Sequence, residues 1–550
     1  MSSIEFDSHI LVITADEVLS PSVLTDPDSA RDWKVRAPEH LAAVLTRWRP
    51  RSLPIDGKKR PAPPQCYLVG AELLGHLGLI SEETTTDTVK EDVQKRLSET
   101  FRAMPEWKER FRPSGGWGYL EHAANRQAVD VVLEPYYHLT AGTYDMGIVG
   151  DGGDYDLPED DGEAARELLR RAMLVMEMLE VMPKAAASST AADSITRHLA
   201  GRKTPITASY QPALEGTASG QDLPERALNW NADRVDPDQL QAADRLVVID
   251  QRAAYLNAAQ QDLGWGAARH VPRGEAEVMI AGKSLPQGWW LIDIPGYDPE
   301  LSDPGLFPVP RPLRTIRGED GKISVARTEG VWVTTETLKH LRRPEETGGA
   351  GVRPGVRQAW VFPESGRPLV DWVERVKIAL WCSDLDECER PMRWQRAMSE
   401  YYFKRIYKSY IGRMAAASTW RSDEVRQHIQ PYWEQTIIAR ARSLAMLRAA
   451  KIRTEHGLTP LSCETDAWTY LVPEGIDLAD TFDGKAWLGK YKLEGECVLT
   501  PDDREALATT TGADFEAVVS KLKVRAKGEV AARGEAERKA RVEAQRGGEG

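Results

Sequence analysis

The sequence has few cysteines and no paired ones. Its five cysteines, among 550 residues, are scattered, odd in number and never in a Cys-x-x-Cys pair, which argues against a disulfide framework and a structural zinc site. Also missing is any apolar run near the roughly 20 residues that span a bilayer. Acids stand near the N-terminus where a signal peptide needs a basic flank. These absences predict a cytoplasmic protein with no membrane partner.

An overall positive charge is absent as well. The 84 Asp and Glu outnumber the 71 Lys and Arg, so the net charge is −13. Such a balance is unusual for a protein that binds DNA over its whole surface. The charge is uneven, however, because residues 390–453 contain fourteen Lys and Arg against four Asp and Glu, a local charge of +10. We expect this segment to form one positive face.

The length predicts two to four domains, since one core rarely grows beyond about 250 to 300 residues. The N-terminal region has a mixed α/β pattern, with an apolar strand at 9–14 and a helix at 163–182. A Ser/Thr/Ala/Gly-rich stretch, 185–222, is interpreted as a linker. Further on we expect strands of one sheet at 245–250, near 289 and near 330, mostly helices over 367–455, a hairpin at 461–472 and a helical last fifty residues.

The run RLVVIDQRAAYL, 245–256, has the pattern of a buried strand followed by a helix. Asp250 ends the strand, and Tyr255 lies five residues further on. A carboxylate at the end of a buried strand, beside a helix N-terminus, can hold a divalent cation in a shallow cleft. The alternative is that Asp250 only caps the helix that follows.

A basic helix is predicted over YYFKRIYKSYIGRMA, 401–415. Helical spacing puts Lys404, Lys408 and Ile411 on one face, and Gly412 lets another backbone or a base pair come close. Two stacked lysines beside a cleft could grip a triphosphate. The alternative is a solvated basic face.

The hairpin LSCETDAWTYLV, 461–472, has acids in its turn and follows a predicted helix at 434–452. An acidic turn between two strands is commonly just exposed to solvent. Here Trp468 and an apolar strand come directly after the turn, so we expect Glu464 and Asp466 to lie on a sheet.

In this order the three elements resemble motifs A, B and C of the family-B DNA polymerases, above all the compact protein-primed branch of phages and linear plasmids. Motif A is D-x-x-S-L-Y-P in the family and DQRAAYL here, from Asp250 to Leu256. Motif B is K-x-x-x-N-S-x-Y-G and here KRIYKSYIG, from Lys404 to Gly412. Motif C is D-T-D and here ETD, from Glu464 to Asp466. The block LGKYKLEGE, 488–496, resembles the family segment after motif C, so the resemblance covers roughly residues 240–500.

The resemblance implies an α+β, multidomain right-hand polymerase with an antiparallel-sheet palm and helical fingers. The implied domains are an N-terminal α/β domain, a degenerate exonuclease-like module, over 1–235, a palm over 236–365 and 426–500, fingers over 366–425, and a thumb-like helical segment or tail over 501–550.

The implied activity is template-directed DNA synthesis by two-metal nucleotidyl transfer, with two Mg²⁺ or Mn²⁺ ions. The implied metal ligands are Asp250, Asp466 and Glu464, and Lys404 acts with the aspartates in catalysis. Tyr255 is the implied steric gate against a ribose 2′-hydroxyl. The implied nucleotide-binding residues are Tyr255, Lys404, Lys408, Ile411 and Arg393. The implied partners are primer-template DNA, dNTPs and a terminal protein or other replication protein, in the nucleoid, on a linear replicon, phage or mobile element.

Some positions depart from the family pattern. Lys408 stands where the family has Asn, and Ile411 where it has Tyr, which puts base-pair checking and catalytic efficiency in doubt. Family exonucleases begin with D-x-E at the end of a strand, whereas the upstream triplet Asp161 to Glu163 lies in an acidic stretch without an apolar strand before it. We therefore expect 3′–5′ editing to be absent.

Two other functions stay open at the level of sequence. One is a non-catalytic replication or telomere-associated DNA-binding protein that keeps the palm as a scaffold, in which either carboxylate would be free to change. The other is an unrelated α/β protein, in which Asp250 and Asp466 would not converge.

Overall fold

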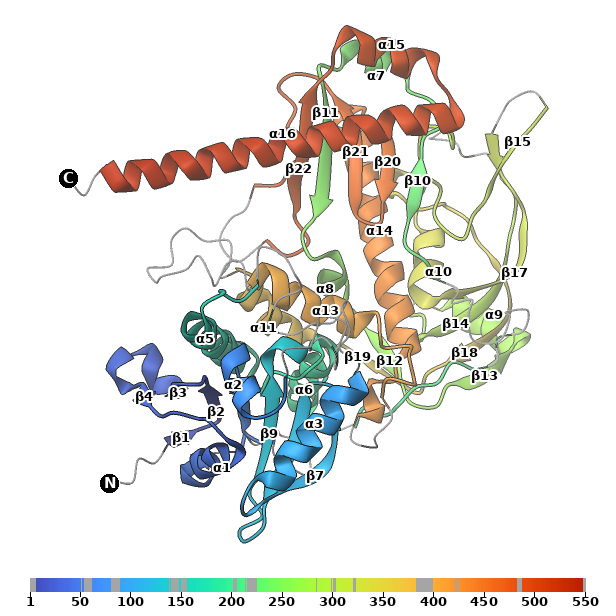
Figure 1. The fold of residues 1–550 in the computed structure, drawn as a ribbon. Coiled ribbons are helices and arrows are strands. Elements are labelled where there is room, and N and C mark those ends of the chain that lie inside the picture. The colour runs from blue at the N-terminus through green and yellow to red at the C-terminus, as the bar shows by residue number, and fades with distance from the viewer. Residues whose placement is uncertain are drawn as a thin grey trace. The chain divides into compact units, whose positions relative to one another are not determined.

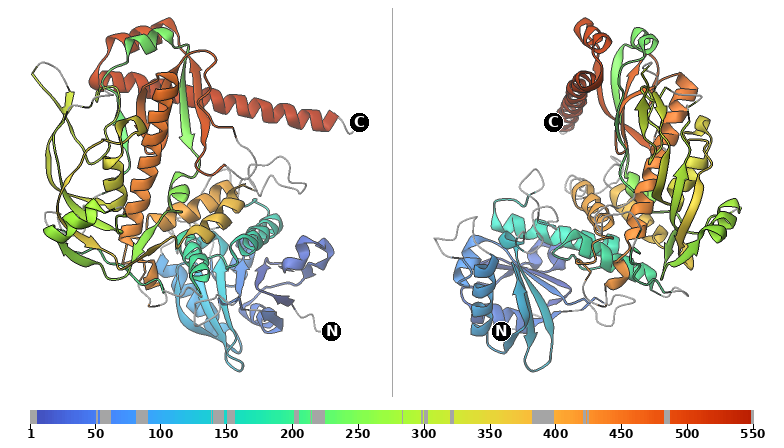
Figure 2. Two further views of the ribbon diagram at one scale, coloured as in Figure 1. Left: turned by 180° about the vertical axis from the view of Figure 1, so that it is seen from behind. Right: turned by 90° about the vertical axis from the view of Figure 1, so that its right-hand side faces the viewer.

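A computed structural model describes the chain in two compact units (Figures 1 and 2). The first unit comprises Met1–Pro205, Asp371–Arg413 and Ser422–Val425, and the second comprises Ile206–Val370, Met414–Arg421 and Arg426–Gly550. The structure describes all residues except 1–5, 51, 54–61, 81–89, 138, 140–147, 150–155, 201–204, 213, 215–224, 283, 298, 300–302, 320–322, 382–398, 421–422, 424, 482–486 and 548–550.

The first unit is built on a seven-stranded sheet of order β4-β3-β2-β6-β9-β8-β7. Its three central strands, β2 (Ile10–Ile13), β6 (Gln65–Leu68) and β9 (Ala128–Leu133), run parallel and are buried along most of their length. Near-continuous apolar runs are typical of parallel strands that are covered on both faces. The remaining strands are β3 (Glu17–Leu19), β4 (Arg31–Asp32), β7 (Trp107–Ser114) and β8 (Trp117–His122), with β1 (Phe6–Ser8) and β5 (Trp48–Pro50) as a separate pair.

One helix of the first unit lies within the stretch that the composition predicts to be a linker. The helix predicted at 163–182 is α5 (Asp161–Leu179), but Ala187–Leu199 also forms a helix, α6, so the linker interpretation is wrong for this part. The small Ala, Ser and Thr side chains of α6 are mostly buried, and α6 packs along α13 (Lys404–Ile411). Small residues permit close packing here; they do not indicate a loose chain. The other helices are α1 (Pro38–Arg47), α2 (Ala71–His76), α3 (Lys90–Ala103) and α11 (Val370–Trp381).

The second unit contains a five-stranded antiparallel sheet of order β10-β20-β21-β11-β22. Its strands are β10 (Asn229–Asn231), β11 (Arg245–Gln251), β20 (Pro460–Glu464), β21 (Ala467–Val472) and β22 (Tyr491–Val498). Along β11, Val247 and Ile249 pack in one core with helix α14 (Pro431–His456), while Leu246 and Val248 pack in a second core with helix α16 (Gly512–Gly547). The two helices therefore cover opposite faces of this sheet, as the edge-on view shows (Figure 2, right).

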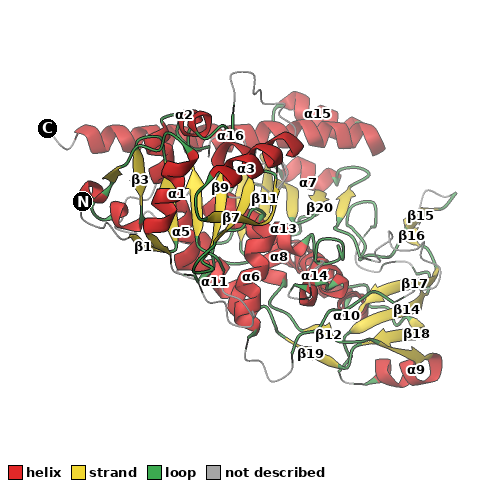
Figure 3. Ribbon diagram, turned by 60° about the horizontal axis from the view of Figure 1, so that its bottom comes forward, coloured by secondary structure: helices red, strands yellow, loops and turns green. Residues whose placement is uncertain are grey.

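A second, four-stranded sheet in this unit has the order β13-β18-β14-β17 (Figure 3). The strands expected near 289 and 330 are β14 (Gly288–Ile294) and β17 (Thr328–Thr334), which pair here and not with β11. The prediction of one sheet is therefore wrong, because an apolar pattern identifies a strand without identifying its partner. The remaining elements are β12 (Leu263–Trp265), β13 (Arg269–Pro272), β15 (Thr315–Arg317), β16 (Ile323–Val325), β18 (Gly355–Val361), β19 (Glu364–Gly366), α7 (Pro237–Ala242), α8 (Ala254–Ala258), α9 (Arg273–Ala281), α10 (Thr335–Arg342) and α15 (Pro501–Thr509).

The fold is a mixed α/β, multidomain arrangement with antiparallel sheets and many helices, as the sequence predicted at this level. Over the described residues, no helix is both long enough and apolar enough to cross a membrane.

Candidate active site

The two aspartates of motifs A and C lie at the same end of the five-stranded sheet. Asp250, next to last in β11, pairs with Ala467, the first residue of β21, and Asp466 directly precedes Ala467. Paired Cα atoms of antiparallel strands lie about 4.5–5.5 Å apart, and consecutive Cα atoms about 3.8 Å. The Cα atoms of the two aspartates are therefore at most about 9 Å apart. This register favours a shared site over the hypothesis in which the aspartates do not converge.

Asp250 does not cap the helix that follows it. Helix α8 begins at Ala254, and its N-cap residue, Ala253, provides no side-chain hydrogen bond. The Asp250 carboxylate lies instead 3.5 Å from the ammonium of Lys492, its partner across β22, and 22% of its side chain is exposed. Asp250 is thus a half-buried carboxylate with a cation beside it, which rules out the simple capping interpretation.

The turn that carries Asp466 is tight, and a residue outside the hairpin accepts a hydrogen bond from it. The backbone N–H of Asp466 donates to the carbonyl of Glu464 (2.7 Å), and Thr465 between them has a φ of 60°. A β-branched residue in this left-handed region is an outlier, and such strain costs about 1–3 kcal/mol. The Thr465 N–H donates in turn to the carbonyl of Leu228 (2.6 Å), just before β10. These contacts place Asp466 directly before β21, beside the end of β11.

Glu464 differs from the two aspartates in its surroundings. Its side chain is 62% exposed, and its carboxylate accepts a hydrogen bond from the ammonium of Lys523, a largely buried residue of α16. Within the described part of the chain, no group of three or more His, Cys, Asp and Glu side chains is arranged to hold a metal ion. The carboxylates that the geometry offers to a metal ion are therefore those of the two aspartates, because the carboxylate of Glu464 is bound by a lysine.

Tyr255 lies at the same site. It is the second residue of α8 and is partly buried. Burial raises the pKa of its phenol, the negative charge of Asp466 raises it further, and a hydrogen bond with Thr465 acts in the opposite direction. The Tyr255 hydroxyl is therefore a neighbour of the Asp466 turn, so the residues predicted as gate and metal ligand share one corner of the fold.

The donor set fits a hard divalent cation. Carboxylate oxygens suit Mg²⁺ and Mn²⁺, and Mg²⁺ needs only one or two protein carboxylates beside water and phosphate oxygens. The nearest soft donor, Cys463, is buried, and its pKa is raised well above the usual value by burial and by the charges of Asp466 and Glu464. Both effects favour the neutral thiol of Cys463, so the carboxylate oxygens of Asp250 and Asp466 fit a hard ion better than this sulfur does.

The predicted nucleotide-binding residues of motif B lie in the other unit. Lys404 and Lys408 are exposed on α13, as expected for a face open to a charged ligand. Ile411, at the end of the same helix, is only 4% exposed and packs inward with Tyr407 and Tyr410. Arg393 lies outside the described residues.

The basic segment 390–453 does not offer all of its charge to a ligand. Arg442 of α14 is buried and lies 2.6 Å from the carboxylate of Glu225. Other cations of α14 also have acidic partners: Arg440 pairs with Glu336, Arg448 with Asp480 and Lys451 with Glu455. The expectation of one positive face is therefore wrong for α14, because ion pairs within the fold use these side chains.

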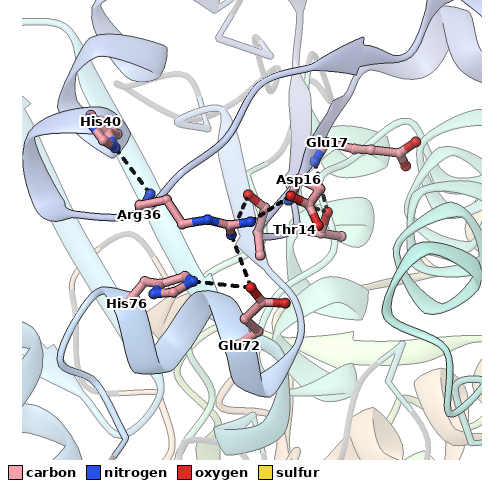
Figure 4. A network of polar contacts seen from close by, with 8 residues as sticks. Thr14, Asp16, Glu17, Arg36, His40, Glu72 and His76 are labelled. Atoms are coloured by element: carbon pink, nitrogen blue, oxygen red, sulfur yellow. Dashed lines mark hydrogen bonds and ion pairs between the residues drawn. The ribbon is translucent and has the colours of Figure 1, made fainter.

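In the first unit, a cation lies among acids that follow two central strands of the sheet. Figure 4 shows Arg36 between two acids that follow β2 and β6: its guanidinium lies 2.7 Å from Asp16 and 3.3 Å from Glu72, which also contacts His76 (3.2 Å). The predicted acidic loop with Asp161 is in fact the first turn of α5. The acids at this edge of the sheet are thus partly neutralised by Arg36.

Two lysines of the site were missed by sequence reasoning. Lys492 lies within the block 488–496 that resembles the segment after motif C, so its position carried a signal. Lys523 carried none, since it is one charged residue of a long helix and reaches Glu464 only through the packing of α16 against the sheet (Figure 1).

The Lys492 ammonium should weaken cation binding at Asp250. Unit charges about 4 Å apart interact by about 1 kcal/mol in water, and this free energy changes a binding constant about fivefold. We therefore expect Lys492→Ala to tighten Mn²⁺ binding about fivefold at low salt, measured by calorimetry or by the spin resonance of free Mn²⁺. The control is Lys527→Ala, which removes an ammonium 2.9 Å from Glu494 on the same strand. An equal change in both variants would show that Lys492 has no specific role.

No known family pattern matches this sequence, and no curated protein is similar enough to match it. Among solved structures, DNA polymerases are similar to it. Phi29 DNA polymerase complexed with primer-template DNA and incoming nucleotide substrates has a TM-score of 0.41 and 12% identity, over 88% of this chain and 84% of that chain. The same polymerase with single-stranded DNA has a TM-score of 0.38 and 11% identity, over 79% and 76%.

Proposed function

We propose that this protein is a DNA-directed DNA polymerase that joins nucleotides by two-metal phosphoryl transfer. The observation that supports this most directly is the register of β11 against β21, which pairs Asp250 with the neighbour of Asp466. Two carboxylates from different strands must meet in this way to hold two ions about 4 Å apart. Bound there, the ions would activate a primer 3′-hydroxyl and neutralise the leaving pyrophosphate.

The proposal gives distinct roles to residues of both units. Asp250, Asp466 and Glu464 would hold the Mg²⁺ or Mn²⁺ ions, and the ion would compete with Lys523 for the carboxylate of Glu464. Tyr255 blocks the space of a ribose 2′-hydroxyl, which its position beside the Asp466 turn supports. Lys404 grips the incoming triphosphate, a role that rests on the motif B resemblance and on the exposure of its side chain.

The same proposal assigns the parts of the chain. The β11 sheet is the palm, the helical segment with α13 belongs to the fingers, and α15 and α16 form a thumb-like segment or tail. The partners are primer-template DNA, dNTPs and a terminal or other replication protein, in the nucleoid, on a linear replicon, phage or mobile element. We also propose that 3′–5′ editing is absent, because Arg36 binds the acids at the edge of the first unit's sheet.

The non-catalytic alternative has less support. A protein that kept the palm only as a scaffold would have no need of a strained Thr465, a turn held by Leu228 and two aspartates side by side. Primer extension on a primed template with Mg²⁺ or Mn²⁺ separates the two hypotheses. Extension that needs both aspartates supports the polymerase, and DNA binding without any extension supports the scaffold.

The motif B assignment predicts the effect of Lys404→Ala. Losing a charge-assisted hydrogen bond costs about 1.5–3 kcal/mol, so the KM for dNTP should rise, or kcat fall, about tenfold or more. Binding of primer-template DNA should change little. The control is Lys451→Ala, which removes an exposed lysine of α14 that pairs with Glu455. The opposite pattern, weak DNA binding with normal nucleotide kinetics, would make α13 a clamp on the DNA backbone.

A further inference from the structure

A cavity of about 740 Å³ lies in the second unit, beside the strand that borders the catalytic hairpin. One wall is formed by Leu228, Asn229 and Trp230, and another by the inner side chains of β17. Asn229 pairs with Glu464, and the Leu228 carbonyl accepts the hydrogen bond from Thr465. The cavity is therefore separated from the turn that carries Asp466 by a single strand.

Three arginines line this cavity: Arg226, Arg311 and Arg314. In the described part of the chain, Glu225 is the only acid that lines the cavity. It is 3% exposed and already bonded, to Arg442 (2.6 Å) and to the backbone N–H and hydroxyl of Thr334 (2.9 and 2.8 Å). Among the described residues, no acid forms an ion pair with Arg311 or Arg314. Arg311 and Arg314 thus bring positive charge to the cavity that no ion pair within the described residues balances.

The main chain at Arg226 is held in place by the fold. Arg442 donates to the carbonyl of Arg226 (2.7 Å), so the buried Glu225 pair anchors the chain at this wall. Burial lowers the pKa of Arg311, the guanidiniums of Arg442 and Arg226 lower it further, and the carboxylate of Glu225 acts in the opposite direction. A bound anion relieves the mutual repulsion of neighbouring guanidiniums, and the forked guanidinium of Arg matches phosphate geometry.

The rest of the lining is apolar or aromatic. Leu313 and Val333 are buried in the cavity wall, and the indole of Trp230 is only partly covered. Sites that bind single-stranded nucleic acid usually combine basic side chains with an aromatic one. The phosphates contact the cations, and a base lies against the aromatic ring. The volume suits one or two nucleotides of one strand and leaves no room for a duplex.

We infer that this cavity binds a segment of single-stranded DNA, with its phosphates on Arg311 and Arg314. The inference rests on the proposed polymerase function, for which it supplies a strand contact next to the catalytic turn. A free nucleotide has the same chemistry as one unit of the strand, and the experiment separates these two sources.

The test is the binding of a fluorescent oligothymidylate of about 12 nucleotides, measured by anisotropy at several salt concentrations without divalent metal. Each phosphate contact with a single strand contributes about 0.7 to the slope of log K against log salt. The double variant Arg311→Ala/Arg314→Ala should therefore lower the slope by about 1.4 and, at about 0.1 M salt, weaken binding about 25-fold. Arg311→Lys/Arg314→Lys should retain the slope, since the charges remain.

The matched control is Arg269→Ala/Arg353→Ala, which removes two exposed arginines of the same unit that do not line the cavity. Equal losses in the test and control variants would overturn the inference. So would displacement of the oligonucleotide by dTMP or dTTP at the affinity of the oligonucleotide itself, which would make the cavity a free-nucleotide site.

The measurement uses no catalysis, so its outcome is independent of the aspartates. A chain that binds the strand through these arginines but extends no primer would support the cavity and refute the polymerase. If the parent chain extends primers, and the Arg311→Ala/Arg314→Ala variant binds the strand as well as the parent, the polymerase function is supported and the cavity inference is refuted.

Discussion

Asp250→Asn and Asp466→Asn should each lower the rate of nucleotide incorporation about a thousandfold or more. Divalent cations contribute several kcal/mol to phosphoryl transfer, and each 1.36 kcal/mol is a factor of ten in rate. Asparagine keeps the shape of aspartate but removes the charge that holds the ion. The rate of primer extension with Mg²⁺ or Mn²⁺ measures the effect.

The fold should survive both changes, because each aspartate is a polar residue at the end of a strand and not part of a core. Circular dichroism and the melting temperature of each variant check this point. Glu474→Gln is the matched control, since it removes an exposed carboxylate beyond the far end of β21. If both aspartate variants extended a primer at the parent rate, the metal assignment would be wrong.

Tyr255→Val should raise the incorporation of ribonucleotides relative to deoxyribonucleotides by about ten- to a hundredfold. The predicted discrimination is a clash between the ring and the 2′-hydroxyl, and overpacking of this kind costs about 1–3 kcal/mol. The ratio of kcat/KM for a ribonucleotide and its deoxy counterpart measures it.

Tyr255→Phe is the control for this prediction. It keeps the ring and removes only the hydroxyl that bonds with Thr465, so the discrimination should persist. A ratio that is unchanged in the valine variant would show that Tyr255 only packs within the fold. A ratio that rises equally in both variants would assign the discrimination to the hydroxyl.

The function proposed above implies DNA synthesis without editing. In the proposed palm, a metal ion has to displace the ammonium of Lys492 from Asp250. In the first unit, the guanidinium of Arg36 is bound to both Asp16 and Glu72. A guanidinium cannot lose its charge near neutral pH, so it competes permanently with a metal ion for those acids. Replacement of Arg36 alone would therefore not create a nuclease, because the described residues hold no metal-binding cluster there.

Several elements could be predicted from the sequence because their information is local. The strand before Asp250, the hairpin around Asp466 and the long helix before it are encoded in apolar alternation, turn residues and helical periodicity. The order of these elements also carried the resemblance to a polymerase. Lys492 was not predicted as a site residue, but it lies within the block 488–496 that resembles the family segment after motif C.

Other features were decided only by the tertiary structure, because they depend on which distant segments meet. Strand pairing put β14 and β17 in a separate sheet, and the register against β21 brought Asp250 beside Asp466. Helix packing brought Lys523 to Glu464 across 59 residues of sequence. A local pattern shows which side of an element is apolar, but the partner of a strand and the counter-ion of a buried charge follow from long-range packing.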